Sequence, residues 1–184
     1  MKKFKFLLLS ACIALVACTT KTSSEQQVSD KGTKWSWDKG TIVVETPERP
    51  AEQTSVIGLT IPKMEVVRVG FVGLGMRGPG AVERFTYIPG VEIVALCDYE
   101  KERAEKCQKY LQRASMPKAA IYSGEKGYEE LCKRDDIDLV YIATDWLHHF
   151  PVAMCAMENN KNVAIEVPSA MDLKECWALV NMSE

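Results

Sequence analysis

The sequence predicts an α/β fold in which helices cover both faces of a doubly wound parallel sheet. From residue 65 onward, short apolar runs rich in β-branched residues alternate with segments whose apolar residues recur at helical spacing. A Gly-x-Gly-x-x-Gly turn follows the first apolar run, and an acidic residue ends the second. This alternation is typical of parallel sheets, because parallel strands need a crossover connection that is usually a helix.

Five strands and five helices account for this region. The strands are expected at residues 66–72, 91–97, 120–122, 139–144 and 162–167. The helices are expected at residues 79–87, 100–113, 127–134 and 150–158, and from residue 172 onward. Pro79 suits the first turn of its helix, where the missing N–H loses no hydrogen bond. Asp172 and Glu175 have the spacing of a capping box, which predicts a helix start.

The composition is that of an ordinary soluble protein. The chain has 184 residues, of which 47% are hydrophobic and 26% are charged. These fractions exclude collagen-like, wholly disordered and multi-span membrane proteins. The 23 basic and 25 acidic residues give a net charge of −2. Without a basic excess, nucleic acid is not an expected partner.

The N-terminus has the pattern of a bacterial export signal. Three lysines precede a mostly apolar run at residues 6–17, which is shorter than the about 20 residues that span a bilayer. The run leads into LVAC at residues 15–18, which resembles a lipobox, where a peptidase cuts before a cysteine that is then lipidated. We therefore expect a signal peptide at residues 1–17 and lipidation of Cys18, in a lipoprotein facing the periplasm or the cell surface. An ordinary signal peptide with a chance cysteine is the alternative.

Residues 18–64 are expected to form a tether and an N-terminal arm. Residues 19–34 are small and polar, as in a flexible linker. Trp35, Trp37 and a possible strand at residues 41–44 favour an arm that lies on a partner surface. The oligomeric state is left open.

The cysteines beyond Cys18 predict neither disulfides nor a zinc site. They form no Cys-x-x-Cys pair, and several fall within apolar patterns, so buried free thiols are the favoured interpretation. They are Cys97, Cys107, Cys132, Cys155 and Cys176. With only two histidines in the chain, a structural zinc ion lacks a ligand set.

The turn at residues 73–78 (GLGMRG) carries the strongest functional signal. Gly73 permits a tight turn, Gly75 lets the backbone approach a pyrophosphate, and Gly78 lets strand and helix pack closely. Asp98 lies 20 residues after Gly78, at the end of the next strand, where a carboxylate accepts hydrogen bonds from a ribose and repels a 2′-phosphate. The pattern predicts a Rossmann domain with strand order 3-2-1-4-5 and favours NAD over NADP. A glycine turn that binds nothing is the alternative.

Two further segments follow strands whose carboxyl ends face the same crevice. In ATDWLHH at residues 143–149, Trp146 offers a flat face to a nucleotide, and His148 or His149 is a candidate donor to a phosphate or hydroxyl. After the next strand, Glu166 is a candidate contact for the nicotinamide ribose. Core packing of Trp146 and simple solvation of Glu166 are the alternatives.

Together these motifs resemble the glucose–fructose oxidoreductase/inositol dehydrogenase (Gfo/Idh/MocA) superfamily. The segments are VRVGFVGLGMRG, VEIVALCD, ATDWLHH and NVAIEVPSAMDLKECW, and they cover about residues 64–184. Within the superfamily they are most similar to glycoside hydrolase family 109, the NAD-dependent α-N-acetylgalactosaminidases.

The resemblance implies a Rossmann domain followed by a larger substrate domain, with NAD kept tightly bound. In that family the sugar is oxidised transiently at C3, which acidifies the C2 proton and permits elimination of the aglycone. Water then adds and the hydride returns, so net redox is zero. Cofactor contacts are implied at Met76 and Arg77 of the glycine turn, at Asp98, at Trp146, Leu147, His148 and His149, and at Glu166 and Val167.

Two positions depart from patterns of the superfamily. Asp145 stands where proline is usual, which makes that turn less rigid. Val167 stands where the ordinary dehydrogenases have a catalytic lysine, and valine cannot transfer a proton. The glycosidase branch is therefore favoured over an NAD-dependent sugar or cyclitol oxidoreductase. A non-catalytic dinucleotide-binding module is the third alternative.

No catalytic residue is assigned in this sequence. The chain is expected to stop before the sixth strand and the C-terminal substrate domain, in which the family's proton-transferring residues lie. We expect it to be the NAD-binding N-terminal part of a secreted glycosidase that acts on a carbohydrate. Free NAD should be scarce outside the cytoplasm, so a cofactor that is regenerated in place suits an exported enzyme.

Overall fold

The computed structural model describes residues 27–28 and 34–184. The chain divides into two compact units, residues 1–45 and residues 46–184. The expected signal peptide and Cys18 lie outside the described residues.

The first unit contains a small antiparallel sheet. Its strands are β1 (Gln27–Val28), β2 (Lys34–Asp38) and β3 (Thr41–Val44), paired in that order. The turn between β2 and β3 consists of Lys39 and Gly40, whose φ values of 48° and 84° are both positive, as tight hairpins require. The strand expected after this turn is present. The two residues of β1 fall within the segment expected to be a tether, and they pair with β2.

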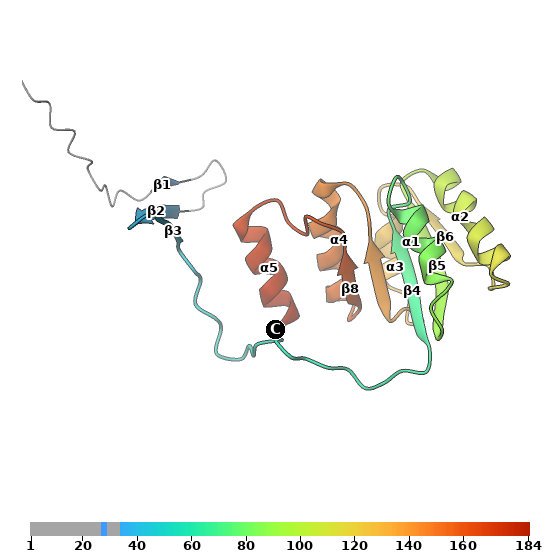
Figure 1. Ribbon diagram of the computed structural model, residues 1–184, viewed down its shortest axis with the longest axis horizontal. Helices are drawn as coiled ribbons and strands as arrows, with labels where there is room; N and C mark the ends of the chain where they lie inside the picture. Colours follow the sequence, from blue (N-terminus) through green and yellow to red (C-terminus); the bar gives the residue numbers. More distant parts are fainter. Residues whose placement is uncertain (1–26, 29–33) are drawn as a thin grey trace, which may run out of the picture. The chain divides into compact units, whose positions relative to one another are not determined.

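A five-stranded parallel sheet forms the centre of the second unit (Figure 1). Its strands are β4 (Val67–Val72), β5 (Val91–Asp98), β6 (Ala120–Ser123), β7 (Leu139–Ile142) and β8 (Asn162–Ile165). They lie in the order β6-β5-β4-β7-β8, which is the predicted order 3-2-1-4-5. The doubly wound Rossmann topology is thereby confirmed. The strand order reverses between β4 and β7, and ligands bind at such a switch point.

Helices follow each strand of this sheet. They are α1 (Gly78–Phe85), α2 (Lys101–Arg113), α3 (Gly127–Cys132), α4 (Trp146–Glu158) and α5 (Leu173–Ser183). The predicted start of α5 is confirmed, since the Asp172 carboxylate accepts a 2.8 Å hydrogen bond from the Glu175 N–H. α4 begins at Trp146 rather than at residue 150, because the Asp145 carboxylate caps it.

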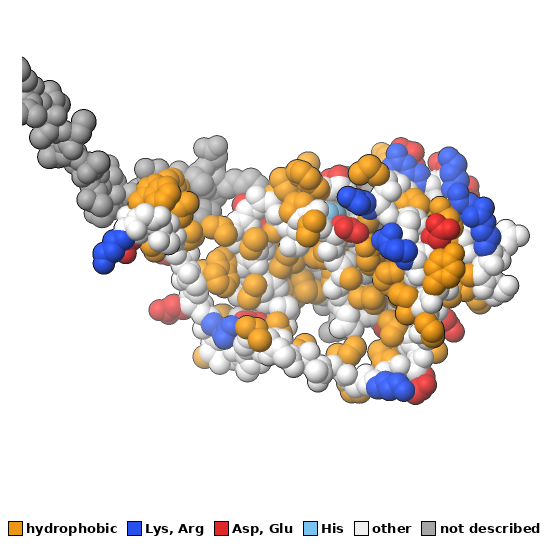
Figure 2. Space-filling model, viewed as in Figure 1, with side chains coloured by type: hydrophobic (Ala, Val, Ile, Leu, Met, Phe, Trp, Pro, Cys, Tyr) orange, Lys and Arg blue, Asp and Glu red, His pale blue; other side chains and the backbone are white. Residues whose placement is uncertain are grey.

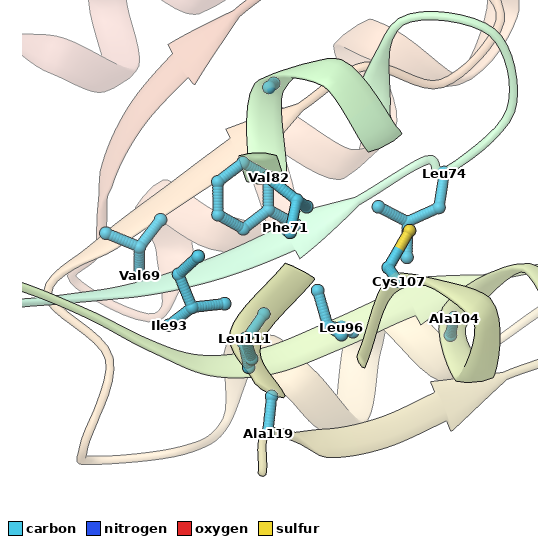
Figure 3. Packing of buried hydrophobic residues seen from close by; sticks show 11 residues of the cluster. Val69, Phe71, Leu74, Val82, Ile93, Leu96, Ala104, Cys107, Leu111 and Ala119 are labelled. Atoms are coloured by element: carbon cyan, nitrogen blue, oxygen red, sulfur yellow. The ribbon is translucent and has the colours of Figure 1, made fainter. Parts of the chain in front are cut away.

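α1 and α2 pack on one face of the sheet. Buried apolar side chains of β4, β5 and the two helices meet there, and Phe71 of β4 points toward α1 (Figure 3). Phe71, Phe85 and Tyr141 form an aromatic cluster on this face, with ring centroids 5.2–5.3 Å apart. Edge-to-face and tilted contacts at this separation stabilise aromatic pairs beyond simple burial.

α3 and α4 cover the opposite face. Leu131 and Cys132 of α3 and Val152 and Ala156 of α4 are buried there with apolar side chains of the central strands. The two faces together bury the sheet, which explains why its strands read as continuous apolar runs in the sequence.

The cysteines of the described region are free thiols. Cys97, Cys107 and Cys132 are buried, as expected, and burial raises the pKa of Cys97 to about 12 and that of Cys107 to about 11. These neutral thiols pack as small apolar side chains. Cys176 is exposed, which corrects the expectation for that residue. Within the described residues, no group of His, Cys, Asp and Glu side chains is placed to hold a metal ion.

The segment before β4 is anchored at the end of α5. Arg49 donates to both carboxylate oxygens of Glu184, at 2.8 and 2.7 Å, and Gln53 Nε2 donates to the carbonyl of Asn181 at 3.0 Å. This part of the expected arm therefore contacts its own domain.

The charges along α2 are mixed in sign. Figure 2 shows Lys and Arg side chains gathered over this helix, with acidic side chains among them. Lys101 pairs with Glu105 at 3.3 Å, and Arg103 pairs with Glu100 at 3.0 Å.

Among the described residues, no helix is long and apolar enough to cross a membrane.

Candidate functional site

A groove of about 1390 Å³ runs along the carboxyl ends of the parallel strands. The turns that follow β4, β5, β6, β7 and β8 all contribute to its wall, because strands of one direction end at one edge of the sheet. The structure brings eleven of the twelve predicted cofactor contacts together in this groove. They are Gly73, Gly75, Met76, Arg77, Asp98, Trp146, Leu147, His148, His149, Glu166 and Val167.

Gly78, the twelfth residue, lies behind the groove and is required by packing. A Cβ at Gly78 would lie 2.0 Å from the carbonyl oxygen of Gly73. At Gly73, which has a φ of +90°, a Cβ would lie 2.4 Å from the backbone nitrogen of Thr144. Side chains cannot be accommodated at such distances without moving backbone. These two glycines therefore bring the β4–α1 turn against itself and against the end of β7.

Gly75 differs from these two glycines because a Cβ there would meet one side chain and no backbone. The nearest contact of a Cβ there would be Arg103 Nη1, at an ordinary 3.5 Å. The α1 N-terminus that follows has no side-chain cap and no acidic residue in its first turn. Uncapped N–H groups and the positive end of the helix dipole favour an anion at this place.

Asp98 closes the groove at the end of β5 and is only 6% exposed. Its Oδ2 accepts a 2.6 Å hydrogen bond from the Leu74 N–H, and its Oδ1 accepts a 2.9 Å bond from the Glu100 N–H. A carboxylate has about four lone-pair sites, so these two bonds leave it acceptor capacity for a ligand. The Leu74 bond also ties the glycine turn to β5.

The groove has contacts that sequence reasoning missed at this end. Arg103 Nη1 lies 3.6 Å from Asp98 Oδ1, and the Tyr99 side chain is largely exposed beside it. The other missed lining residues include Gly124, Glu125, Tyr128 and Thr144. Tyr99 and Arg103 follow Asp98 within five residues in the sequence, which is a usable signal. The residues after β6 reach the groove because β6 pairs with β5 in the sheet, and no local sequence pattern indicates that pairing.

The β7–α4 turn is held by Asp145. Its Oδ1 accepts a 3.0 Å hydrogen bond from the Leu147 N–H, and its Oδ2 lies 2.7 Å from His148 Nδ1. Burial opposes ionisation of Asp145, but the hydrogen bond and charge of His148 prevail and lower its pKa. Proline has no side-chain acceptor, so aspartate caps α4 where proline cannot.

Trp146 and His149 occupy opposite environments. Trp146 is 59% exposed on the groove, which contradicts the core-packing alternative. His149 is buried, with Nδ1 2.6 Å from the Pro168 carbonyl oxygen and Nε2 3.1 Å from that of Thr144. Both ring nitrogens of His149 thus face backbone acceptors of the protein, and the imidazole joins the turn after β7 to the turn after β8.

Glu166 and Val167 form the far end of the groove. Glu166 is half-buried, and its Oε1 accepts a 2.6 Å hydrogen bond from the Tyr141 hydroxyl, so the alternative of simple solvation does not describe it. Val167 is 84% exposed and lines the groove with an aliphatic side chain. This end therefore offers one carboxylate and no proton-transferring group at position 167.

Comparison with known proteins agrees with this geometry. A family model described as "Oxidoreductase family, NAD-binding Rossmann fold" matches residues 67–184, and the chain belongs to this family. A solved structure of myo-inositol dehydrogenase from Lactobacillus casei, in complex with NAD(H) and myo-inositol, is similar with a TM-score of 0.56. It is 27% identical over 64% of this chain and 33% of that chain.

Within this family, the most informative relatives are glycoside hydrolases. The chain is 74% identical to the Glycosyl hydrolase family 109 protein 5 of Phocaeicola vulgatus, over 100% of the chain and 36% of the relative. It is 57% identical to the Glycosyl hydrolase family 109 protein 1 of Bacteroides thetaiotaomicron, over 98% of the chain and 37% of the relative. The resemblance to glycoside hydrolase family 109 is thereby confirmed. The chain spans little more than a third of the length of these relatives.

The glycines of the turn supply a matched pair of substitutions. Gly73→Ala forces a Cβ into backbone at a positive φ, and we expect it to lower the free energy of unfolding by about 1–3 kcal/mol. Gly75→Ala meets only an ordinary contact, and we expect a change within about 0.5 kcal/mol. Its added methyl group instead obstructs the approach to the backbone, so NAD affinity should fall. Urea denaturation and calorimetric titration measure the two effects; equal stability of both variants contradicts this account of the turn.

Proposed function

We propose that the chain is the NAD-holding part of a glycosidase in which the cofactor is reduced and reoxidised within one turnover. The observation that carries this proposal is the aliphatic Val167 at the far end of a dinucleotide groove. An ordinary dehydrogenase of the superfamily needs a proton-transferring side chain there. The relatives named as family 109 glycosyl hydrolases support the same choice.

The residues of the groove fit NAD. The uncapped N-terminus of α1 and the open face of Gly75 suit the pyrophosphate. The remaining acceptor sites of Asp98 suit the adenosine ribose diol, and its charge would repel a 2′-phosphate. At the other end, Trp146 offers a flat face and Glu166 an acceptor to the nicotinamide nucleoside. NAD bound in this way supplies a reversible hydride acceptor for a sugar carbon.

A chimaera tests the glycosidase proposal. In it, residues 1–184 of this chain replace the matching part of the Phocaeicola vulgatus relative, and the substrate is p-nitrophenyl α-N-acetylgalactosaminide. We expect release of nitrophenol without net accumulation of NADH. In D2O we also expect deuterium at C2 of the released sugar, because elimination removes the C2 proton and solvent returns one. The chimaera carrying Gly75→Ala is the control for use of the cofactor and should lose most of this activity.

Two outcomes contradict the proposal. One is release of nitrophenol with the original C2 hydrogen retained, which indicates direct displacement at C1. The other is stoichiometric NADH formation with a polyol such as myo-inositol and no nitrophenol release, which favours the oxidoreductase alternative.

We further propose that the protein is exported and anchored to a membrane through Cys18. The proposal rests on the export pattern of residues 1–18, and it agrees with a cofactor that needs no resupply outside the cytoplasm. In a bacterium that processes lipoproteins, the chain should incorporate labelled palmitate, and Cys18→Ala should abolish the label. Cys176→Ala, at an exposed cysteine, is the matched control and should keep it. A Cys18→Ala protein that is still labelled contradicts the anchor.

A further inference from the structure

The hydroxyl of Tyr141 lies at a fixed point between the core and the groove. Its ring packs against Phe71 and Phe85 under α1, at centroid distances of 5.2 and 5.3 Å. Because Phe71 and Phe85 also contact each other, the Tyr141 ring is one of three mutually packed rings and has little freedom to change rotamer. The hydroxyl at its end is therefore presented in one direction.

That direction leads to the carboxylate of Glu166. The Tyr141 hydroxyl donates to Glu166 Oε1 at 2.6 Å, the length expected for a bond between a hydroxyl and a charged acceptor. Burial, followed by the bond to Glu166, raises the pKa of Tyr141, so the hydroxyl keeps its proton at neutral pH. Glu166 Oε2 has no hydrogen-bond partner in the part of the chain that the structure describes.

The backbone around Glu166 is held by other contacts. The Glu166 N–H donates to the Ile142 carbonyl at 2.9 Å. Two residues further on, the Pro168 carbonyl oxygen lies 2.6 Å from His149 Nδ1. These contacts fix the turn on both sides without Tyr141. The Tyr141 hydroxyl therefore acts on the orientation of the Glu166 side chain alone. Without this bond, the three rotatable bonds of that side chain are unrestrained by Tyr141.

We propose that Tyr141 is a positioning residue for the cofactor: it fixes Glu166 so that the second carboxylate oxygen is presented to the hydroxyls of the nicotinamide ribose. The inference rests on the proposed function, because it assumes NAD in the groove. On this proposal NAD affinity depends also on Tyr141, which lies outside the groove on the α1 face of the sheet. Pre-orientation lowers the conformational entropy that Glu166 loses when the ligand binds.

The variant that tests this proposal is Tyr141→Phe, which keeps the ring in the aromatic cluster and removes only the hydroxyl. In calorimetric titrations of the purified chain, we expect NAD to bind up to about tenfold more weakly, which is the scale of ordering one flexible side chain on binding. Tyr122→Phe is the matched control. It also removes a half-buried hydroxyl, which accepts a hydrogen bond from Arg134 and does not line the groove, and it should leave NAD affinity unchanged.

Two further measurements separate positioning from a general structural effect. AMP lacks the nicotinamide ribose, so its affinity should be the same for Tyr141→Phe and the unsubstituted chain. In a Glu166→Ala background, Tyr141→Phe should cause no additional loss of NAD affinity, because the carboxylate it positions is gone.

Each result decides between the claims. Unchanged NAD affinity in Tyr141→Phe, or an equal loss of AMP affinity, overturns the positioning role while leaving the proposed function intact. Additive losses from Tyr141→Phe and Glu166→Ala overturn it as well. Failure of the unsubstituted chain to bind NAD contradicts the proposed function and, with it, this inference.

Discussion

The absence of side chains at two glycines is the constraint on which the site depends. Gly73 and Gly78 let the β4–α1 turn fold against its own backbone and against the end of β7, at distances that a Cβ would block. Only this close turn places the α1 N-terminus beside the switch point of the sheet and brings the Leu74 N–H to the Asp98 carboxylate. The same constraint therefore creates the anion site and joins it to the ribose acceptor.

Polar contacts of the protein with itself hold the turns that line the groove. His149 links the turns after β7 and β8 through two carbonyl oxygens, and Asp145 caps α4. Tyr141 donates to Glu166 from the face of the sheet that α1 covers. The adenosine end is organised mainly by backbone N–H donors, whereas the nicotinamide end is organised by side chains. We therefore expect substitutions of residues that do not contact the ligand to lower NAD affinity most at the nicotinamide end.

The strand order and most of the groove were predictable from the sequence, because local patterns determine them. Apolar runs mark the strands, and the spacing from Gly78 to Asp98 marks one crossover unit. The bond between Tyr141 and Glu166 was not predictable, since it joins residues 25 apart through strand pairing. The early start of α4 depended on one capping aspartate, and β1 depended on a partner strand. Both depend on hydrogen bonds that hydrophobic periodicity does not record.

Binding of NAD and NADP to the purified 184-residue chain tests the central claim most directly. Calorimetric titration should find one NAD per chain, and NADP should bind at least about tenfold more weakly because its 2′-phosphate meets the Asp98 carboxylate. The difference should shrink at high salt, since solvent ions screen part of the repulsion. Equal affinities for the two dinucleotides, or no binding of NAD, would contradict the assignment of the groove.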